Sequence, residues 1–258
     1  MNCLTNIIAY EKHDEGYGEI CLNRPEKNNA VSQEMTKELM TILEDTKQDS
    51  LKFLVVTGNG NMFCAGGDLL DLHGDLTTDE AFSLLYPMKE VLFELANFPV
   101  PTIAMLNGNA LGGGCELATA CDVRIAKEAT TFGFVQTKLG ILPGWGGGAL
   151  LYEKVNPSFA MNWLMEASIL KADQLMQQGW LQKIVPMEDW EGNFNDILKS
   201  YISKSYEQMR MMKLQYKKKI SSLSLSSFMS EEVRNCASLW ETPEHRAAVS
   251  KFINRNAD

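Results

Sequence analysis

Leu111-Gly112-Gly113-Gly114-Cys115-Glu116 is the stretch that decides the fold and places the candidate chemistry. Consecutive glycines let the backbone turn sharply and leave peptide amides exposed to a bound group. The residues from Glu116 to Ala120 are typical of a helix start, where free N–H groups and the positive end of a dipole favour an anion. Glu116 lies one turn further on, within reach to hold or move a proton. A glycine turn that only opens a structural helix has the same pattern.

A second glycine turn upstream repeats this arrangement. Phe53–Thr57 is a short apolar, β-branched run typical of a buried strand, and Phe63-Cys64-Ala65-Gly66-Gly67-Asp68 follows it. The order of strand, loop, glycine pair and acid recurs around Thr102 to Glu116. Two small-residue turns at strand ends can point two amides at one oxygen atom, which is the physical form of an oxyanion hole.

Five segments together resemble the crotonase superfamily, also called the enoyl-CoA hydratase/isomerase family. They are Leu22–Ala30, Phe63–Leu69, Asn107–Ala118, Cys121–Ala126 and Leu139–Gly147. The order and spacing of the segments agree with the family over nearly the whole chain. The resemblance implies an α/β fold, a crotonase-like spiral of ββα turns with a helical C-terminal oligomerisation region. We expect an acyl-CoA-binding core over residues 1–195 and the helical region over residues 196–258.

Composition restricts the classes of function. A chain of 258 residues with 45% hydrophobic content can bury a large core, and its net charge of −9 argues against a broad nucleic-acid-binding surface. Met1–Glu15 has no basic segment and no long apolar run, so we expect no signal or transit peptide, and no segment reaches membrane-spanning length. The six cysteines form no CxxC pair. We therefore expect free thiols, no metal site and a cytoplasmic location.

The hydrophobic pattern predicts alternating strands and helices, and hence a parallel α/β core. The predicted elements are a hairpin of Ile7–Tyr10 and Tyr17–Leu22, a helix over Ser32–Gln48 capped by Ser32, a helix over Asp79–Ala96 and a strand over Thr102–Leu106. From Asn156 onward the pattern becomes mostly helical and more polar.

The resemblance implies chemistry on a thioester. In crotonases the carbonyl oxygen of acyl-CoA lies between two backbone amides that stabilise an enolate, and the matching positions are Gly67 and Gly113. Coenzyme A is then part of the substrate and no separate cofactor is expected. The positions that match the family's CoA-binding surface are Asn29, Ala30, Ala65 and Gly66, with Arg24 and Lys27 as candidate phosphate partners.

One departure from the family pattern bears on the reaction. Enoyl-CoA hydratases use two glutamates, of which Glu116 matches the first. The second belongs to a Q-P-E-x-x-x-G segment that reads Val135-Gln136-Thr137 around the acidic position, so Gln136 takes its place. An amide can bind a water molecule but cannot transfer a proton at neutral pH. Efficient hydration is therefore not expected.

A decarboxylase does not need the second acid. Loss of CO2 from a malonyl-type thioester gives the same enolate, and one proton donor completes the reaction. The run from Phe134 to Gly147 is similar to ethylmalonyl-CoA decarboxylases, which carry a tryptophan like Trp145 before two glycines. We therefore expect a lyase acting on a short 2-carboxyacyl-CoA, with Trp145 in the acyl pocket or in packing.

The residues alone also permit other functions. They are an enoyl-CoA hydratase, an isomerase in which Glu116 moves a proton between carbons, and a non-catalytic homologue that binds acyl-CoA or a macromolecule. The acidic net charge disfavours an RNA-binding homologue. The C-terminal part of family members forms trimers, which often pair into hexamers, so the resemblance implies a homotrimer or homohexamer.

Overall fold

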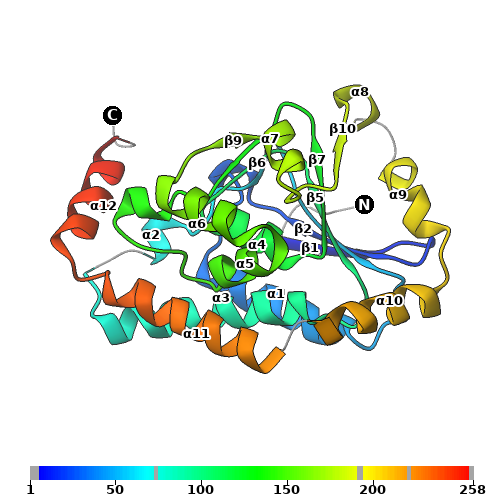
Figure 1. Cartoon of the computed structure of the whole chain (residues 1–258), viewed down its shortest axis with the longest axis horizontal. Coiled ribbons are helices and arrows are strands. Elements are labelled where there is room, and N and C mark those ends of the chain that lie inside the picture. Colours follow the sequence, from blue (N-terminus) through cyan, green and yellow to red (C-terminus); the bar gives the residue numbers. More distant parts are fainter. Residues whose placement is uncertain (1–5, 73–74, 191–193, 220–221, 256–258) are drawn as a thin grey trace.

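Two β-sheets form the centre of the chain, which the computed structural model describes over residues 6–72, 75–190, 194–219 and 222–255 (Figure 1). The larger sheet has the strand order β1-β2-β3-β5-β7-β10 and the smaller sheet the order β4-β6-β8-β9. The strands of the larger sheet are β1 Ile8–Lys12, β2 Gly18–Leu22, β3 Leu54–Gly58, β5 Thr102–Leu106, β7 Val123–Lys127 and β10 Lys183–Val185. Those of the smaller sheet are β4 Met62–Cys64, β6 Asn109–Leu111, β8 Thr131–Gly133 and β9 Leu170–Lys171.

The chain winds through both sheets in repeated turns of two strands and a helix. The successive turns are β3-β4-α3, β5-β6-α4 and β7-β8-α5, with α3 at Thr78–Ala96, α4 at Gly113–Ala120 and α5 at Gly147–Lys154. Each turn adds a parallel strand to each sheet: Val55 pairs with Ile103, and Met62 pairs with Asn109. The predicted parallel α/β core is therefore confirmed, and the carboxyl ends of neighbouring strands lie side by side.

Local signals fixed most element ends. Helix α1 spans Gln33–Thr46, and the Ser32 side chain caps it by accepting a hydrogen bond from the Met35 amide at 3.2 Å. Helix α3 begins behind a capping box of Thr77 and Glu80. The predicted hairpin forms as β1 and β2, paired antiparallel. Helix α4 begins at Gly113, ahead of the predicted Glu116, so the Gly113 amide lies in its first turn.

The short elements connect the larger ones. They are η1 Pro25–Lys27, α2 Leu69–Leu72, η2 Gln136–Leu139, α6 Pro157–Glu166, α7 Ala172–Gln177 and α8 Met187–Trp190. The larger sheet is covered on both faces: Leu54 and Val56 belong to the main core, whereas Phe53 and Val55 face a second core with Trp190 and Leu198.

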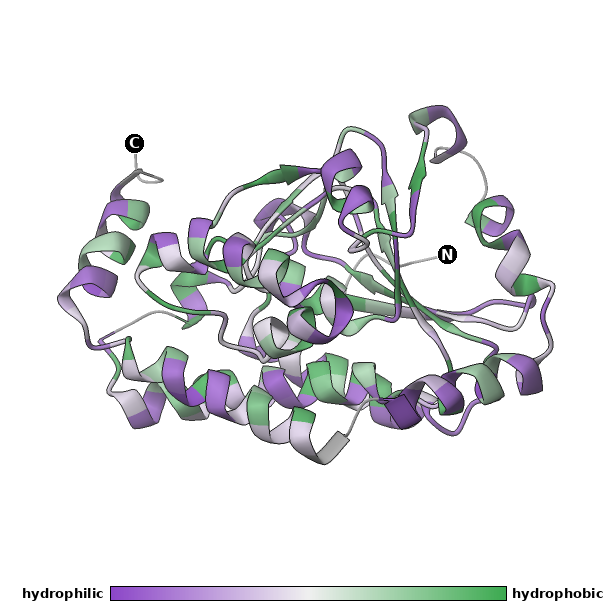
Figure 2. Cartoon of the chain, in the orientation of Figure 1, coloured by the Kyte–Doolittle hydropathy of each residue, from purple (hydrophilic) through white to green (hydrophobic). Residues whose placement is uncertain are grey.

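Helices dominate the C-terminal part. They are α9 Phe194–Ile202, α10 Tyr206–Lys219, α11 Ser222–Ser238 and α12 Pro243–Arg255. Helix α11 packs against α3 and α5, and α12 lies at one end of the molecule (Figure 1). These helices alternate between hydrophilic and hydrophobic residues, as expected for helices with one face on a core (Figure 2). In the described residues, no helix has the length and apolar character needed to cross a membrane.

Candidate active site at two glycine turns

The two glycine turns lie against each other. They follow the neighbouring parallel strands β4 and β6, so both leave the same edge of the smaller sheet. A Cβ atom placed on Gly66 would be 3.0 Å from the Leu111 carbonyl oxygen and 3.2 Å from the Gly113 nitrogen. The turns are therefore in backbone contact, which a side chain at Gly66 would prevent.

The amides of Gly67 and Gly113 are available as donors. Neither donates a hydrogen bond to another residue of the described chain, although the amides of the neighbouring Asp68 and Glu116 do. The preceding Gly112 has φ 54° and ψ −120°, a conformation that glycine alone adopts readily. Two unpaired N–H groups thus lie on adjacent turns, which is the arrangement an oxyanion hole requires. Their role toward a thioester stays a prediction.

The Trp145 indole lies over both turns. A Cβ atom on Gly113 would be 2.2 Å from Cζ3 of the ring, and one on Gly67 would be 3.5 Å from Cζ2. Trp145 is only 4% exposed. Its benzo edge therefore forms an apolar wall beside the two amides, and its place in an acyl pocket stays a prediction.

The Glu116 carboxylate is held by four donors. Oε1 accepts from Gln136 Nε2 at 2.8 Å and from the Gly144 amide at 3.3 Å. Oε2 accepts from the Trp145 and Gly147 amides, both at 2.9 Å. A carboxylate has about four lone-pair sites, so these contacts occupy its acceptor capacity. In this arrangement Glu116 is positioned firmly, and it must exchange a contact before it takes up a proton.

Burial and hydrogen bonding oppose each other at Glu116. The side chain is 2% exposed, and burial raises its pKa, whereas the bonds from Gly147, Trp145, Gln136 and Gly144 lower it. The net shift of the pKa is upward. Gln136 is also buried, and its Oε1 has no hydrogen-bond partner among the described residues. That oxygen can accept a hydrogen bond from a water molecule or a hydroxyl group.

A second glutamate, which the sequence analysis did not predict, binds the glycine-rich segment that also contacts Glu116. Glu232 on α11 accepts from the Gly148 amide at 3.1 Å and from the Ala149 amide at 2.7 Å. Burial, followed by the charge of Glu116, raises the pKa of Glu232 well above its usual range. Nothing in the local sequence of α11 marks this residue, because its partners are backbone groups far away in the chain.

The residues predicted to bind CoA gather beside the first glycine turn. Ala65 donates its amide to the Asn28 carbonyl at 3.0 Å, and the Gly66 carbonyl accepts from Val31 at 2.8 Å. Ala30 lies in the same loop, and Lys27 is exposed at the end of η1. The structure thus brings these predicted residues together, and Lys27 is open to a ligand.

Arg24 and Asn29 already have internal partners. Arg24 Nη2 lies 3.0 Å from Asp68 Oδ2, and Nη1 donates to the Ala30 carbonyl at 2.8 Å. The side chain of Asn29 is fully buried and donates to the carbonyls of Asn59 and Met62. Both residues brace the loop, so their proposed contacts with CoA stay predictions.

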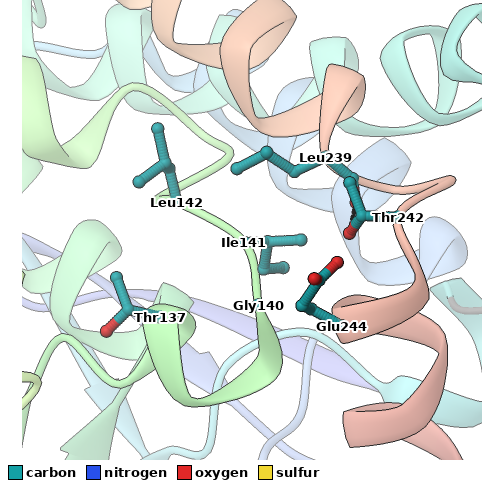
Figure 3. Close-up of a pocket in the computed structure, with 7 residues that line it drawn as sticks. All are labelled: Thr137, Gly140, Ile141, Leu142, Leu239, Thr242 and Glu244. Carbon is teal, nitrogen blue, oxygen red and sulfur yellow. Dashed lines mark hydrogen bonds between the residues drawn. The ribbon is translucent and has the colours of Figure 1, made fainter.

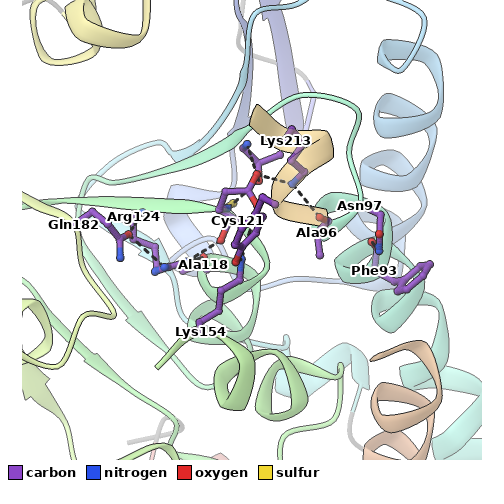
Figure 4. Close-up of polar contacts among 12 residues, drawn as sticks. Phe93, Ala96, Asn97, Ala118, Cys121, Arg124, Lys154, Gln182 and Lys213 are labelled. Atoms are coloured by element: carbon purple, nitrogen blue, oxygen red, sulfur yellow. Dashed lines mark hydrogen bonds and ion pairs between the residues drawn. The ribbon is translucent and has the colours of Figure 1, made fainter. Parts of the chain in front are cut away.

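A buried polar network fixes the far end of α4 (Figure 4). Arg124 Nη1 donates to the Ala118 and Cys121 carbonyls at 3.4 and 2.7 Å, which satisfies the end of the helix. Asp122 accepts from the Thr102 amide and pairs with Lys213 at 2.5 Å. These contacts anchor the helix that carries Glu116, and Asp122 braces the start of β5 through Thr102.

A cavity of about 350 Å³ lies between the segment after Gln136 and the corner of α11 and α12 (Figure 3). Its lining is Thr137, Gly140, Ile141, Leu142, Leu239, Thr242 and Glu244. Next to Glu244, Nδ1 of His245 lies 2.6 Å from the Leu139 carbonyl oxygen. Neither glycine turn lines the cavity, so it flanks the candidate site without being part of it.

Comparison with known proteins identifies the family. A family model described as enoyl-CoA hydratase/isomerase matches residues 12–257. The chain belongs to the enoyl-CoA hydratase/isomerase family. It is therefore an acyl-CoA enzyme of the crotonase superfamily, and the resemblance stated from its motifs is confirmed.

Relatives of this crotonase differ in their reactions. It is 31% identical over 247 residues to a probable enoyl-CoA hydratase of Mycobacterium bovis, with 95% of each chain covered. It is 35% identical over 180 residues to an ethylmalonyl-CoA decarboxylase of Xenopus laevis, which covers 69% of this chain and 60% of the frog protein. Family membership therefore leaves the reaction open.

Solved structures confirm the crotonase-like fold. An enoyl-CoA hydratase/isomerase from Xanthobacter autotrophicus has a TM-score of 0.85 at 25% identity, covering 97% of this chain and 98% of that one. An enoyl-CoA hydratase from Bacillus halodurans has a TM-score of 0.85 at 22% identity, covering 95% of this chain and 100% of that one. The spiral of ββα turns and the C-terminal helices are thus family features.

Proposed function

We propose that this crotonase is a lyase that decarboxylates a short 2-carboxyacyl-CoA. The amides of Gly67 and Gly113 would hold the thioester carbonyl oxygen. The bond to the carboxylate breaks, CO2 leaves, and the electron pair forms the enolate, whose negative oxygen the two amides stabilise. A proton then adds to the α-carbon.

The observation that carries this proposal is that four hydrogen-bond donors already occupy the carboxylate of Glu116. Its oxygens accept four hydrogen bonds, and the neighbouring acidic position holds Gln136. Hydration needs groups that activate water and transfer a proton, whereas decarboxylation forms the enolate without a base. A water molecule on Oε1 of Gln136 would relay a proton from Glu116, which gives up that proton after it exchanges one of its contacts. The apolar wall of Trp145 favours loss of the charged carboxylate, because burial of a charge is costly.

Hydration is the second candidate. The free Oε1 of Gln136 can bind the water that hydration requires, and the M. bovis relative carries the name of a hydratase. Isomerisation with Glu116 as the base, and binding of acyl-CoA or a macromolecule without turnover, are the remaining alternatives. We also propose a cytoplasmic location and a homotrimer or homohexamer.

The test is a turnover screen with ethylmalonyl-CoA, methylmalonyl-CoA, crotonyl-CoA and a 3-enoyl-CoA. Release of CO2 at a kcat/KM above that for crotonyl-CoA hydration is expected. Faster hydration than decarboxylation would overturn the proposal. Binding of the thioesters in calorimetry without any turnover would favour the non-catalytic alternative.

A further inference from the structure

Two carboxylates hold one glycine-rich segment. In Gly144-Trp145-Gly146-Gly147-Gly148-Ala149, three amides donate to Glu116 and two donate to Glu232, and the Gly146 backbone also hydrogen-bonds to Glu232. All six consecutive residues therefore bind an acidic side chain from another helix. Four of them are glycines, which have little conformational preference of their own. The conformation of this segment is thus imposed by its two acidic partners.

Helix α11 follows the outer side of the segment. A Cβ atom on Gly146 would be 2.6 Å from Cε of Met229, and one on Gly144 would be 3.0 Å from Sγ of Cys236. Glu232 lies between these two residues in the helix and makes the hydrogen bonds. The C-terminal helical region therefore contacts the segment that carries Trp145, and Glu232 is its polar contact.

We propose that Glu232 is a positioning residue for the candidate active site. It fixes the first turn of α5, so that the preceding residues hold the Trp145 indole over Gly67 and Gly113 and keep three amides on Glu116. When an amide nitrogen replaces one carboxylate oxygen, either Gly148 or Ala149 loses the acceptor of its N–H group, and the glycines allow the segment to move. The consequence for thioester binding rests on the proposed function, whereas the position of the indole does not.

The test uses Glu232→Gln, with Glu231→Gln as the matched control. Glu231 is the exposed neighbour on the same helix, so the control makes the same substitution without touching the segment. The emission of Trp145 is isolated as the difference between each protein and its Trp145→Phe counterpart, because the chain has five tryptophans. Affinity for butyryl-CoA, a saturated thioester with no carboxylate to lose, is measured by calorimetry.

We expect Glu232→Gln to shift the Trp145 emission to longer wavelength, because the nearly buried indole gains exposure to water. We also expect at least tenfold weaker binding of butyryl-CoA. The control should match the unmodified protein in both measurements. A folded Glu232→Gln protein with unchanged Trp145 emission would overturn the proposal and leave Glu232 as a helix cap that contributes only to stability.

A second variant covers the case in which Glu232→Gln does not fold. Glu232→Asp keeps the acidic group but withdraws it from the amides, and a smaller shift of emission in the same direction is expected. Loss of folding in both variants would assign Glu232 to global stability and refute the positioning role. The emission is measured without any thioester, so a shift together with no CO2 release would uphold this inference while the proposed function fails.

Discussion

The Trp145 ring lies so close to Gly113 that no side chain fits between them. A Cβ atom at Gly113 would be 2.2 Å from Cζ3 and 2.4 Å from Cη2 of the indole, distances that real Cβ atoms do not show. Glycine at this position therefore has two separable functions. It leaves space for the indole, and its amide is free to bind an oxygen atom.

A pair of substitutions separates these functions. Gly113→Ala and Gly113→Pro both add a Cβ atom against Trp145, but only proline removes the N–H donor. Proline is accepted in the first turn of a helix, and Gly113 is the first residue of α4. We expect Gly113→Pro to lose about 3 kcal/mol more transition-state stabilisation than Gly113→Ala, measured from kcat/KM. Equal losses in the two folded variants would refute the oxyanion role of this amide.

Glu116→Gln should abolish turnover and lower stability. The substituted amide brings two N–H donors toward peptide N–H groups that now donate to a carboxylate. We expect the free energy of unfolding to fall by roughly 3 kcal/mol, from denaturant titration. Glu128→Gln, at an exposed position, is the control and should change neither quantity. Full turnover in Glu116→Gln would show that this carboxylate takes no part in the chemistry.

Hydration of crotonyl-CoA should be about 10²–10⁴-fold slower than in hydratases with two glutamates, since Gln136 cannot transfer a proton. Gln136→Glu should raise hydration, while Gln136→Met, of similar size but without polar atoms, should not. The measurement is kcat/KM for crotonyl-CoA. A value near about 10⁸ M⁻¹s⁻¹ in the unmodified protein would show that hydration is its reaction.

We expect the free energy of unfolding to depend on pH through Lys154. Burial lowers its pKa from 10.5 to about 8, against the opposing effect of Asp122. Between those two pH values the folded chain binds fewer protons than the unfolded chain, so this lysine makes the free energy of unfolding rise with pH. The rise is up to about 1.4 kcal/mol per pH unit. Relative to Lys154→Met, the unmodified protein should gain stability across that window.

Denaturant titrations at several pH values measure this difference. Lys218→Met, at an exposed position on α10, is the control and should follow the unmodified protein. Parallel pH profiles for Lys154→Met and the unmodified protein would contradict the prediction.

We expect the chain to assemble into an oligomer through its C-terminal helices. Several large apolar side chains on the C-terminal helices are exposed, namely Met211, Met212, Leu214, Phe228 and Phe252. Exposed apolar surface of this kind favours association between copies of a chain. We expect light scattering at micromolar concentration to show a trimer or a hexamer. A single species of 28.9 kDa, the mass of one chain, would exclude both.

Local sequence signals predicted much of the fold and part of the site. The sequence predicted the Ser32 cap, the strand over Thr102–Leu106 and the glycine turns, because each depends on neighbouring residues or on the conformational freedom of the backbone. The sequence did not predict that Arg24 and Asn29 form hydrogen bonds within the protein. Their partners, Asp68 and the Met62 carbonyl, come from another turn of the spiral.

The sequence by itself determined the α/β class, the two glycine turns and the presence of Glu116 and Gln136 at the two positions where the family's hydratases have glutamates. These features follow from residue type and spacing, which act over short range along the chain. Only the tertiary structure decided that four donors occupy Glu116, that Trp145 covers both turns and that Glu232 reaches the same segment. The partners in those contacts are mainly backbone amides and glycines, and no side-chain pattern in a sequence shows which carboxylate they will meet.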